Sequence, residues 1–394
     1  MFVKAIIEQM SCGCLFKFSF FEEVGSFLFD FSFEWQDVLF LIMVVLLLIV
    51  LFYDIYDLVK IHGFKVQQEK EGKLSKKEER KGDFYDFEKV MVDVIIPVYN
   101  MGDTFPRTLR SVERSEFKNK RVIVVDDGSD DGKTPQILDG VKDRVDLLFH
   151  LPHGGKAKTV NFGAEKGKGD VIFFLDADSH IIPDFIEVSL SELNEEVDAI
   201  DFVQQVANPD DSVWTRIAAF EREILTFKPD NFGALFVIKR GFFKDFKFRD
   251  CLSPQLDIDQ RLLIAGKLKI SPKKVVFADE PVTFRRMYRR KRRWVYGMLQ
   301  TYKMNNQRLD FHIYLPFLDL FLLFSFFLVF FDLRFILIPV ILLFSWFLKT
   351  SILSKMFKQG YRMVPWYAFY MLVLSIAVID AVLRFKIGRK VSWT

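Results

Sequence analysis

Residues 121–132 read RVIVVDDGSDDG, an apolar run that ends abruptly in acidic residues and glycine. Similar apolar runs occur in VDVIIPVY at 92–99 and in DVIFFLDAD at 170–178, separated by polar, helix-like stretches. Short and nearly continuous apolar strands that alternate with helices are typical of a parallel sheet covered on both faces. We therefore predict an α/β domain over residues 92–282, with its site at the carboxyl edge of the strands, where open α/β sheets bind ligands.

Apolar residues are also concentrated outside this domain. Of the 394 residues, 51% are hydrophobic and 27% are charged, so the two kinds must occupy different segments. The unbroken apolar run at 38–53 predicts a transmembrane helix over 35–60, preceded by an interfacial segment at 1–34. Lysine-rich sequence follows, and basic residues favour the inner side of a membrane. We interpret 61–91 as a solvated cytoplasmic linker.

Apolar sequence returns near the C-terminus. Residues 311–385 predict two or three spanning or re-entrant helices, followed by a tail at 386–394. The segment 349–363 carries four basic residues and no acid, which favours a cytoplasmic loop. Four basic residues at 384–390 favour the same side, but three crossings after the domain would not place both clusters there. The sequence therefore leaves the number of crossings open.

The acidic residues that end the strands can bind a cation or shape a turn. Counted from Asp126 or Asp127, the twelfth position is apolar, which excludes an EF-hand loop because that loop needs a bidentate Glu there. An acidic turn stays open for this segment. In DAD, the two-residue period of an extended chain puts Asp176 and Asp178 on one side. Two carboxylates so placed can bind Mg²⁺ or Mn²⁺ beside a diphosphate.

Taken in order, VIIPVYN at 94–100, DDGSDDG, GGKAKTVNFGAEKGKGD at 154–170 and DAD resemble the nucleotide-binding half of family-2 glycosyltransferases. The resemblance covers roughly residues 92–300 and implies a Rossmann-like, GT-A type domain inserted between transmembrane helices. It implies that Asp176 and Asp178 hold Mg²⁺ or Mn²⁺ and the donor diphosphate, with a UDP-sugar favoured. The residues that would line the nucleotide pocket are Pro97, Tyr99, Asp126, Asp127 and Lys156. From the residues alone, Lys156 beside two glycines suits a phosphate-facing loop or a lysine in a surface turn.

QLDID at 255–259 is similar to the acidic base motif of the same family. The similarity assigns Asp257 as the general base that deprotonates the acceptor hydroxyl. The family usually has an acidic residue just before the base, where this chain has Leu256. Asp259 is the alternative base, or a cap of the following helix.

RKRRW at 290–294 matches the (Q/R)xxRW signature of the family, within an amphipathic interfacial helix expected at 283–310. Helical spacing puts Arg290, Arg293 and Trp294 on one face, where they could contact the diphosphate and the acceptor. The many basic residues of this helix also suit anionic lipid headgroups. Gly233, in NFGA, resembles a segment that contacts the acceptor, or it belongs to an ordinary turn.

These motifs favour an inverting transfer of sugar from a nucleotide-sugar donor to a growing polysaccharide. The Arg-rich helix followed directly by membrane segments resembles the processive synthases of hyaluronan, chitin, cellulose and poly-N-acetylglucosamine. The alternative is a single transfer to a polyprenyl phosphate or another lipid, because four or so helices are few for a passage. A non-catalytic scaffold is less favoured. Asp319 and Asp380 lie in apolar stretches, where they predict a polar passage or mark helix ends.

The expected location is the cell membrane, as an integral protein with its catalytic domain in the cytoplasm. The expected partners are a nucleotide-sugar donor, a saccharide or lipid acceptor, and membrane lipids. A net charge of only +3 gives no indication of nucleic-acid binding.

Overall fold

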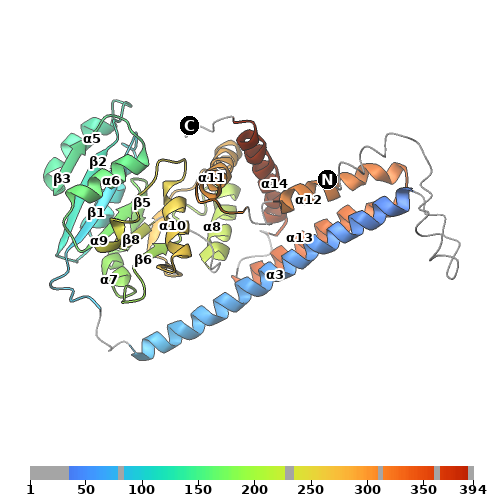
Figure 1. The fold of residues 1–394 in the computed structure, drawn as a ribbon, viewed down its shortest axis with the longest axis horizontal. Coiled ribbons are helices and arrows are strands. Elements are labelled where there is room, and N and C mark those ends of the chain that lie inside the picture. The colour runs from blue at the N-terminus through green and yellow to red at the C-terminus, as the bar shows by residue number, and fades with distance from the viewer. Residues whose placement is uncertain (1–34, 79–83, 227–234, 309–313, 359–363, 389–394) are drawn as a thin grey trace.

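The computed structural model describes residues 35–78, 84–226, 235–308, 314–358 and 364–388. An α/β domain occupies one end of the molecule, and long apolar helices occupy the other (Figure 1). Helices α11 (Phe284–Met304) and α14 (Val364–Lys386) lie between these two parts. The region in which the sheet ends and α11 begins therefore connects the α/β domain to the apolar helices.

A seven-stranded sheet forms the centre of the domain, in the order β3-β2-β1-β4-β8-β6-β9. All neighbouring strands are parallel except β8, which is antiparallel to β4 and β6. The strands are β1 (Val92–Val98), β2 (Lys120–Asp126), β3 (Leu147–His150), β4 (Val171–Leu175), β6 (Ala199–Phe202), β8 (Leu235–Lys239) and β9 (Leu268–Ser271). The predicted α/β sheet is confirmed, with one strand reversed.

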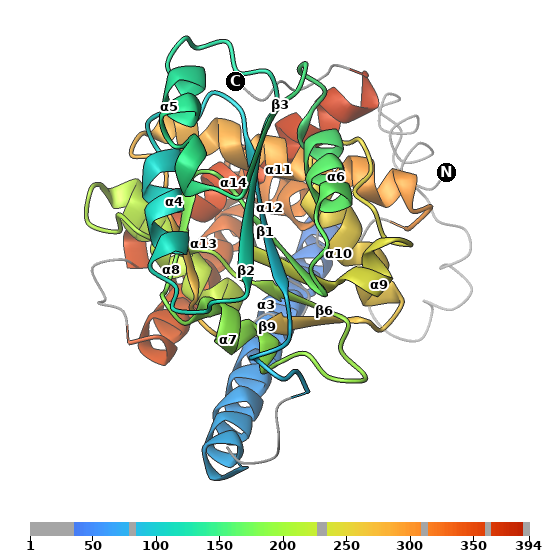
Figure 2. The ribbon, with the colours of Figure 1, turned by 90° about the vertical axis from the view of Figure 1, so that its left-hand side faces the viewer.

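Helices cover both faces of the sheet, as Figure 2 shows. One face packs against α4 (Phe105–Glu113), α5 (Thr134–Gly140) and α7 (Phe185–Leu190), and the other against α6 (Lys156–Lys166), α9 (Arg240–Phe243) and α10 (Pro254–Ile264). Val94 and Ile96 of β1 lie in the first core, and Ile95 lies in the second. Both sides of the strand are buried, which explains why the strands read as continuous apolar runs.

A second, three-stranded sheet joins segments that are distant in the sequence. It consists of β5 (Ser179–Ile181), β10 (Val276–Ala278) and β7 (Gln205–Val206), in that order. β5 begins directly after Asp178, and β10 is followed shortly by α11 (Phe284–Met304). This sheet therefore brings the beginning of α11 toward the acidic end of β4. The helices η1 (Lys142–Arg144) and α8 (Val213–Thr226) complete the domain.

Helix α3 (Trp35–Glu78) is much longer than the helix predicted at 35–60. Residues 61–78, which we interpreted as part of a solvated linker, continue the same helix, so that prediction was wrong for them. This segment is rich in Lys, Glu and Gln, which are good helix formers. Lys65 and Glu69 pair one turn apart at 3.9 Å, which also favours the helix.

Three helices in the described parts of the chain are long and apolar enough to cross a membrane: Trp35–Lys70, Leu333–Met356 and Val364–Lys386. The first lies within α3, the second comprises η4 (Leu333–Ile336) and α13 (Leu337–Met356), and the third is α14 (Val364–Lys386). A shorter apolar helix, Leu315–Phe330, comprises α12 (Leu315–Phe324) and η3 (Ser325–Phe330). This arrangement agrees with the apolar helices expected over 311–385.

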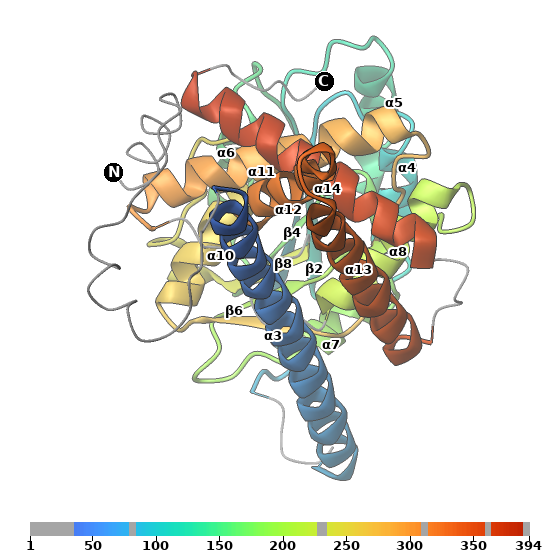
Figure 3. The same cartoon turned by 90° about the vertical axis from the view of Figure 1, so that its right-hand side faces the viewer.

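Helix α13 lies beside α3 and runs in the same direction (Figure 3). Arg334 pairs with Asp37 at 2.6 Å near the beginning of both helices. Lys349 pairs with Asp54 at 2.7 Å further along, and Lys65 Nζ donates a hydrogen bond of 2.6 Å to a main-chain oxygen at the end of α13. The core between α3, α12 and α13 is apolar, and its buried members are Met43, Leu47, Val50, Leu322, Phe335, Ile338, Leu342 and Trp346.

Candidate functional site

The predicted site lies at the carboxyl edge of the sheet. Val98 of β1 pairs with Asp126 of β2, and Ile95 of β1 pairs with Phe174 of β4. The three strands therefore end at one edge, and they deliver Tyr99, Asp126 and Asp176 there. Pro97 lies inside β1, opposite Val125. These motifs lie at one edge of a parallel part of the sheet, as we predicted from the sequence.

Asp126 and Asp127 organise the loops around this edge. Asp126 Oδ1 accepts hydrogen bonds from the Ser129 main-chain nitrogen at 3.1 Å and from its hydroxyl at 2.6 Å. Asp127 accepts hydrogen bonds from the main-chain nitrogens of Gly154 at 2.8 Å and Gly155 at 3.0 Å. Both carboxylates are buried. They connect the β2 loop to the glycine loop that begins α6, so the nucleotide pocket predicted from them is built on a fixed frame.

An aromatic pair lies above this frame. The Tyr99 ring stacks on the His153 imidazole with ring centroids 4.4 Å apart and planes inclined by 26°. Tyr99 is 38% exposed, so its ring offers a face to a planar ligand such as a nucleotide base. The sequence analysis did not identify His153, although it directly precedes the two glycines of the predicted phosphate-facing loop.

Lys156 begins α6 and reaches the DAD motif. Its Nζ lies 2.5 Å from Asp176 Oδ1, so the lysine predicted to face a phosphate compensates an aspartate at the metal position in this state. Asp176 and Asp178 do not lie in an extended strand, because β4 ends at Leu175 and a turn follows. In this turn the main-chain nitrogen of Ser179 donates a hydrogen bond of 3.0 Å to the main-chain oxygen of Asp176. The extended-chain argument was therefore wrong, and the turn brings the two carboxyl groups together instead.

Burial raises the pKa of Asp178, and the negative charge of Asp176 raises it further. Arg290 and Lys156 oppose this shift. Two neighbouring carboxylates that repel each other favour the binding of a cation between them. In the part of the chain that the structure describes, no group of three or more His, Cys, Asp or Glu is placed to hold a metal ion. Mg²⁺ and Mn²⁺ are commonly held by one or two carboxylates together with substrate phosphates, so this donor pair fits such an ion only when a diphosphate is also bound.

Asp257, the predicted base, lies at the beginning of α10 and is fully buried. Arg249 binds both of its oxygens, through Nε at 2.8 Å and through Nη2, and Arg261 Nε lies 3.1 Å from Oδ2. Asn305 Nδ2 approaches the same carboxylate at 3.4 Å. Two guanidinium groups thus compensate one carboxylate. This arrangement suits an aspartate that holds α10 in place better than one that accepts a proton.

Asp259, the alternative base, has a different environment. It is fully buried, and Gln255 Nε2 donates a hydrogen bond of 2.9 Å to its Oδ1. Burial raises its pKa well above the ordinary value, and the charge and side-chain hydrogen bond of Asp201 raise it further. The positive charge of Lys156 opposes this rise in the pKa of Asp259. The sequence analysis missed Asp201, although an acid inside the apolar run AIDF of β6 was a visible signal.

Arg290 and Arg293, from the signature of α11, face the DAD motif from the side opposite to Lys156. Arg290 Nη1 pairs with Glu280 Oε2 at 2.9 Å, and its Nη2 lies 3.5 Å from Gln204 Oε1. Burial lowers the pKa of Arg293, and the charge of Arg290 lowers it further, whereas Asp178 and Asp176 raise it. Both arginines therefore act on the two aspartates. The helix face that carries Arg290 and Arg293 is directed at this site. The Trp294 ring packs against the guanidinium groups of Arg222 and Arg290, whose centres lie 4.8 and 4.9 Å from the ring centroid.

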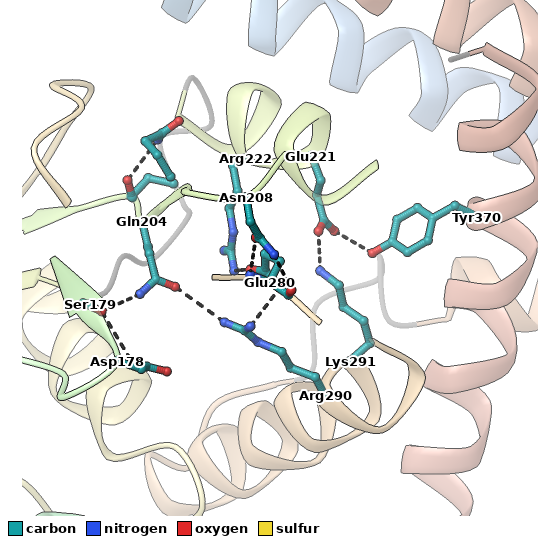
Figure 4. Close-up of polar contacts among 12 residues, drawn as sticks. Asp178, Ser179, Gln204, Asn208, Glu221, Arg222, Glu280, Arg290, Lys291 and Tyr370 are labelled. Carbon is teal, nitrogen blue, oxygen red and sulfur yellow. Dashed lines mark hydrogen bonds and ion pairs between the residues drawn. The ribbon is translucent and has the colours of Figure 1, made fainter. Parts of the chain in front are cut away.

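A polar network extends from the DAD motif to α14, as Figure 4 shows. Gln204 joins Ser179 to Arg290, with bonds of 2.8 and 3.5 Å. Glu280 pairs with Arg222 at 3.0 Å as well as with Arg290. Beside them, Glu221 binds Lys291 and accepts a hydrogen bond of 2.9 Å from the Tyr370 hydroxyl of α14. The network fixes α11 between the catalytic edge and α14.

The remaining predictions concern positions at the margin of the site. Gly233 lies outside the described residues. Asp380 pairs with Arg292 of α11 at 3.1 Å and with Arg384 of its own helix α14 at 2.7 Å, so its charge is compensated from both helices. Asp319 is buried in α12. A polar passage past these two aspartates stays a prediction.

The α/β domain is similar in sequence to known proteins. Residues 93–248 match the family model described as Glycosyl transferase family 2. An uncharacterized glycosyltransferase of Haemophilus influenzae is 36% identical over 104 residues, which are 26% of this chain and 41% of that protein. An undecaprenyl-phosphate 4-deoxy-4-formamido-L-arabinose transferase of Pseudomonas savastanoi is 32% identical over 133 residues, 32% of this chain and 38% of the relative. The chain thus matches less than half the length of either relative.

A mannosyltransferase from Pyrobaculum calidifontis, solved with GDP-Man and Mn²⁺, has the same fold with a TM-score of 0.52 at 16% identity. The likeness covers 86% of this chain and 100% of the solved one. At this identity it supports the GT-A architecture alone.

Proposed function

Because the chain carries a family-2 glycosyltransferase domain of GT-A fold at residues 93–248, we propose that it transfers one sugar from a nucleotide-sugar donor to a hydroxyl group of a membrane glycolipid. The observation that carries this proposal is the convergence of Lys156, Asp176, Asp178 and Arg293 at one sheet edge, next to a buried carboxyl pair. The proposed transfer is a single displacement that inverts the anomeric centre.

The donor diphosphate is proposed to bind between the DAD turn and α11. Asp176 and Asp178 would hold Mg²⁺ or Mn²⁺, which supplies positive charge to the departing diphosphate. Lys156, which now binds Asp176, would be free to contact a phosphate oxygen if a cation compensated that carboxylate. Arg290 and Arg293 approach from α11 and add positive charge on the other side. Tyr99 supports the nucleotide base by stacking.

We assign the base to Asp259 in place of Asp257. The acceptor oxygen bonds to the anomeric carbon, the bond from that carbon to the diphosphate breaks, and the acceptor proton passes to Asp259. The carboxyl group best suited to this transfer has a raised pKa, and burial together with Asp201 raises the pKa of Asp259. The acceptor hydroxyl would take the place of the Gln255 amide at Asp259 Oδ1. Asp257 lacks this freedom because two arginines hold it.

The proposal replaces the growing polysaccharide of the sequence analysis with a lipid acceptor. In the described helices, the space between α3, α12 and α13 is filled by apolar side chains, and Asp54 and Lys349 at its edge pair with each other. A hydrophilic polymer needs a polar path, which this packing does not offer. The Pseudomonas relative is named for the lipid undecaprenyl phosphate. A phosphate acceptor is already an anion and needs no base, so the carboxyl pair supports a hydroxyl acceptor.

The test uses the full chain in lipid-containing detergent with Mn²⁺ or Mg²⁺ and a panel of nucleotide sugars. Acceptors are a glycolipid mixture, a polyprenyl phosphate, and no addition. We expect nucleotide release that depends on glycolipid, with one labelled sugar recovered per lipid. A polymer ladder would support the synthase alternative, and transfer to polyprenyl phosphate alone would overturn the hydroxyl acceptor. Silence with every donor and acceptor would support the scaffold.

Asp201→Asn is expected to move the acidic limb of the kcat/KM profile to lower pH. The charge of Asp201 helps to hold the pKa of Asp259 high, and an amide at that position would instead donate a hydrogen bond to the Asp259 carboxylate. The base then stays ionised at lower pH, so activity persists further into the acidic range. The measurement is kcat/KM against pH for wild type and variant. An unchanged limb, with activity intact, would contradict the role of this pair.

A further inference from the structure

We propose that α14, although long and apolar enough to span a membrane, lies flat on the bilayer surface, on the side of the catalytic domain. Its exposed apolar stripe then binds the boundary between headgroups and acyl chains of a bilayer that contains anionic lipids. The inference concerns membrane contact and topology, and it does not depend on which sugar or acceptor the enzyme uses.

The beginning of α14 packs against α8 of the catalytic domain, and its end packs against α11. Near its beginning, the Tyr367 ring contacts Phe220 of α8 with centroids 4.8 Å apart, and the Tyr370 hydroxyl bonds Glu221 of α8 at 2.9 Å. Near its end, Phe385 contacts Tyr296 of α11 with centroids 5.4 Å apart. A helix of 23 residues is about 34 Å long, enough to separate its ends across the hydrocarbon core. Because its beginning touches α8 of the catalytic domain and its end touches the arginine-rich α11, α14 does not cross.

Helix α14 packs most extensively against α11, and it also contacts α12, α13 and α8. Residues 285–293 of α11 contain six Arg and one Lys, which excludes this helix from hydrocarbon. Asp380, in the second half of α14, pairs with Arg292 at 3.1 Å and accepts a hydrogen bond of 3.2 Å from the Tyr288 hydroxyl. In Figures 1 and 3, α14 runs across the direction of α3 and α13. It therefore lies at the depth of α11, where the spanning helices enter the membrane.

The outer side of α14 suits a lipid surface. Trp366, Phe369, Ile376 and Leu383 are 44–53% exposed, and the last three follow each other at intervals of two helical turns, so they form one stripe. Basic residues accompany it: Arg384 and Lys386 lie at the end of α14, and the neighbouring helix α11 carries the exposed Arg285, Arg286 and Arg289. An apolar stripe with basic flanks is the pattern of a helix that lies in the interface of an anionic membrane.

A flat α14 also removes the conflict between the two basic clusters near the C-terminus, which three crossings would place on opposite sides of the membrane. α13 runs in the direction of α3, so the helix Leu315–Phe330 makes the return crossing between them. Lys355 and Lys358, at the end of α13 and just after it, then lie on the side of the domain, and a flat α14 keeps Arg384 and Lys386 on the same side. Were α14 to cross, the second cluster would lie on the opposite side.

The first experiment measures membrane depth. In the full chain, with the native Cys12, Cys14 and Cys251 replaced by Ser, single cysteines replace Phe369, Ile376 or Leu383 and carry a spin label in vesicles that contain phosphatidylglycerol. We expect equal, shallow depths from the oxygen and nickel accessibilities. The control is Leu41, Leu48 and Ile55 of α3, with the same spacing and similar exposure, which should differ by about 10 Å from one to the next. The same gradation on α14 would overturn the proposal.

A second experiment does not require α14 to be labelled within the membrane. Lys386→Cys and the domain-surface variant Lys142→Cys, in the same background, are exposed to an impermeant maleimide in sealed vesicles. Both positions are exposed, and Lys142 lies in η1, far from the site described above. We expect both to be labelled in the same vesicle orientation. Labelling from opposite sides would show that α14 crosses.

Discussion

Asp259→Asn is expected to lower kcat for glycolipid acceptors by about 10²- to 10⁴-fold, the range over which general bases contribute, while the protein stays folded. The amide cannot accept the proton of the acceptor hydroxyl. It can still hydrogen-bond with Gln255, which now donates to Asp259 Oδ1 at 2.9 Å, and it removes a charge that is unfavourable beside Asp201. Donor binding, measured as the Kd for the nucleotide with Mn²⁺, should be unchanged.

Asp257→Asn is the matched control from the same helix. It leaves Arg249 and Arg261 without the carboxylate that both now bind, and breaking a buried ion pair costs about 3 kcal/mol of unfolding free energy. We expect a lower Tm and a proportionate loss of folded enzyme, with kcat per folded molecule largely retained. If instead the Asp257 variant is stable and inactive while the Asp259 variant is active, the assignment from sequence motif was right and ours is wrong.

Asp178→Asn is expected to lower kcat/KM by roughly 10³-fold, because loss of the cation that neutralises the diphosphate removes several kcal/mol of transition-state stabilisation. The readout besides activity is calorimetric titration of nucleoside diphosphate in the presence and absence of Mn²⁺. In wild type the cation should strengthen nucleotide binding, and in the variant this difference should be largely lost.

The same substitution should not destabilise the protein. Burial and Asp176 raise the pKa of Asp178 in the folded state above its unfolded value. The stability that such a group contributes is present below its unfolded pKa and is lost as the pH rises through the folded pKa, so at neutral pH the ionised side chain weakens the fold. Removing the charge is expected to leave Tm equal or higher. The control Asp143→Asn, at an exposed position of η1, should change neither metal dependence nor activity. Full Mn²⁺ dependence in the Asp178 variant would contradict the site.

Much of the fold followed from local patterns. The runs at 92–99, 121–127 and 170–178 became β1, β2 and β4, because a strand buried on both faces must be apolar throughout. Two local inferences were wrong for local reasons. Residues 61–78 are helical because their charged side chains are good helix formers, and DAD is a turn because β4 ends one residue earlier.

By itself the sequence determined the class of the protein and the edge of the sheet at which its site is expected. Both follow from local features, namely the order of the apolar runs and the acidic residues that come after them. It could not determine which acid accepts a proton. Asp257 and Asp259 are two residues apart, and their difference comes from Arg249 on one side and from Asp201, on a distant strand, on the other. Nor could it determine the orientation of α14, because an apolar helix looks alike whether lipid or a neighbouring helix covers it. Both proposals rest on pairing and packing between segments far apart in the chain, which fix charge compensation and burial.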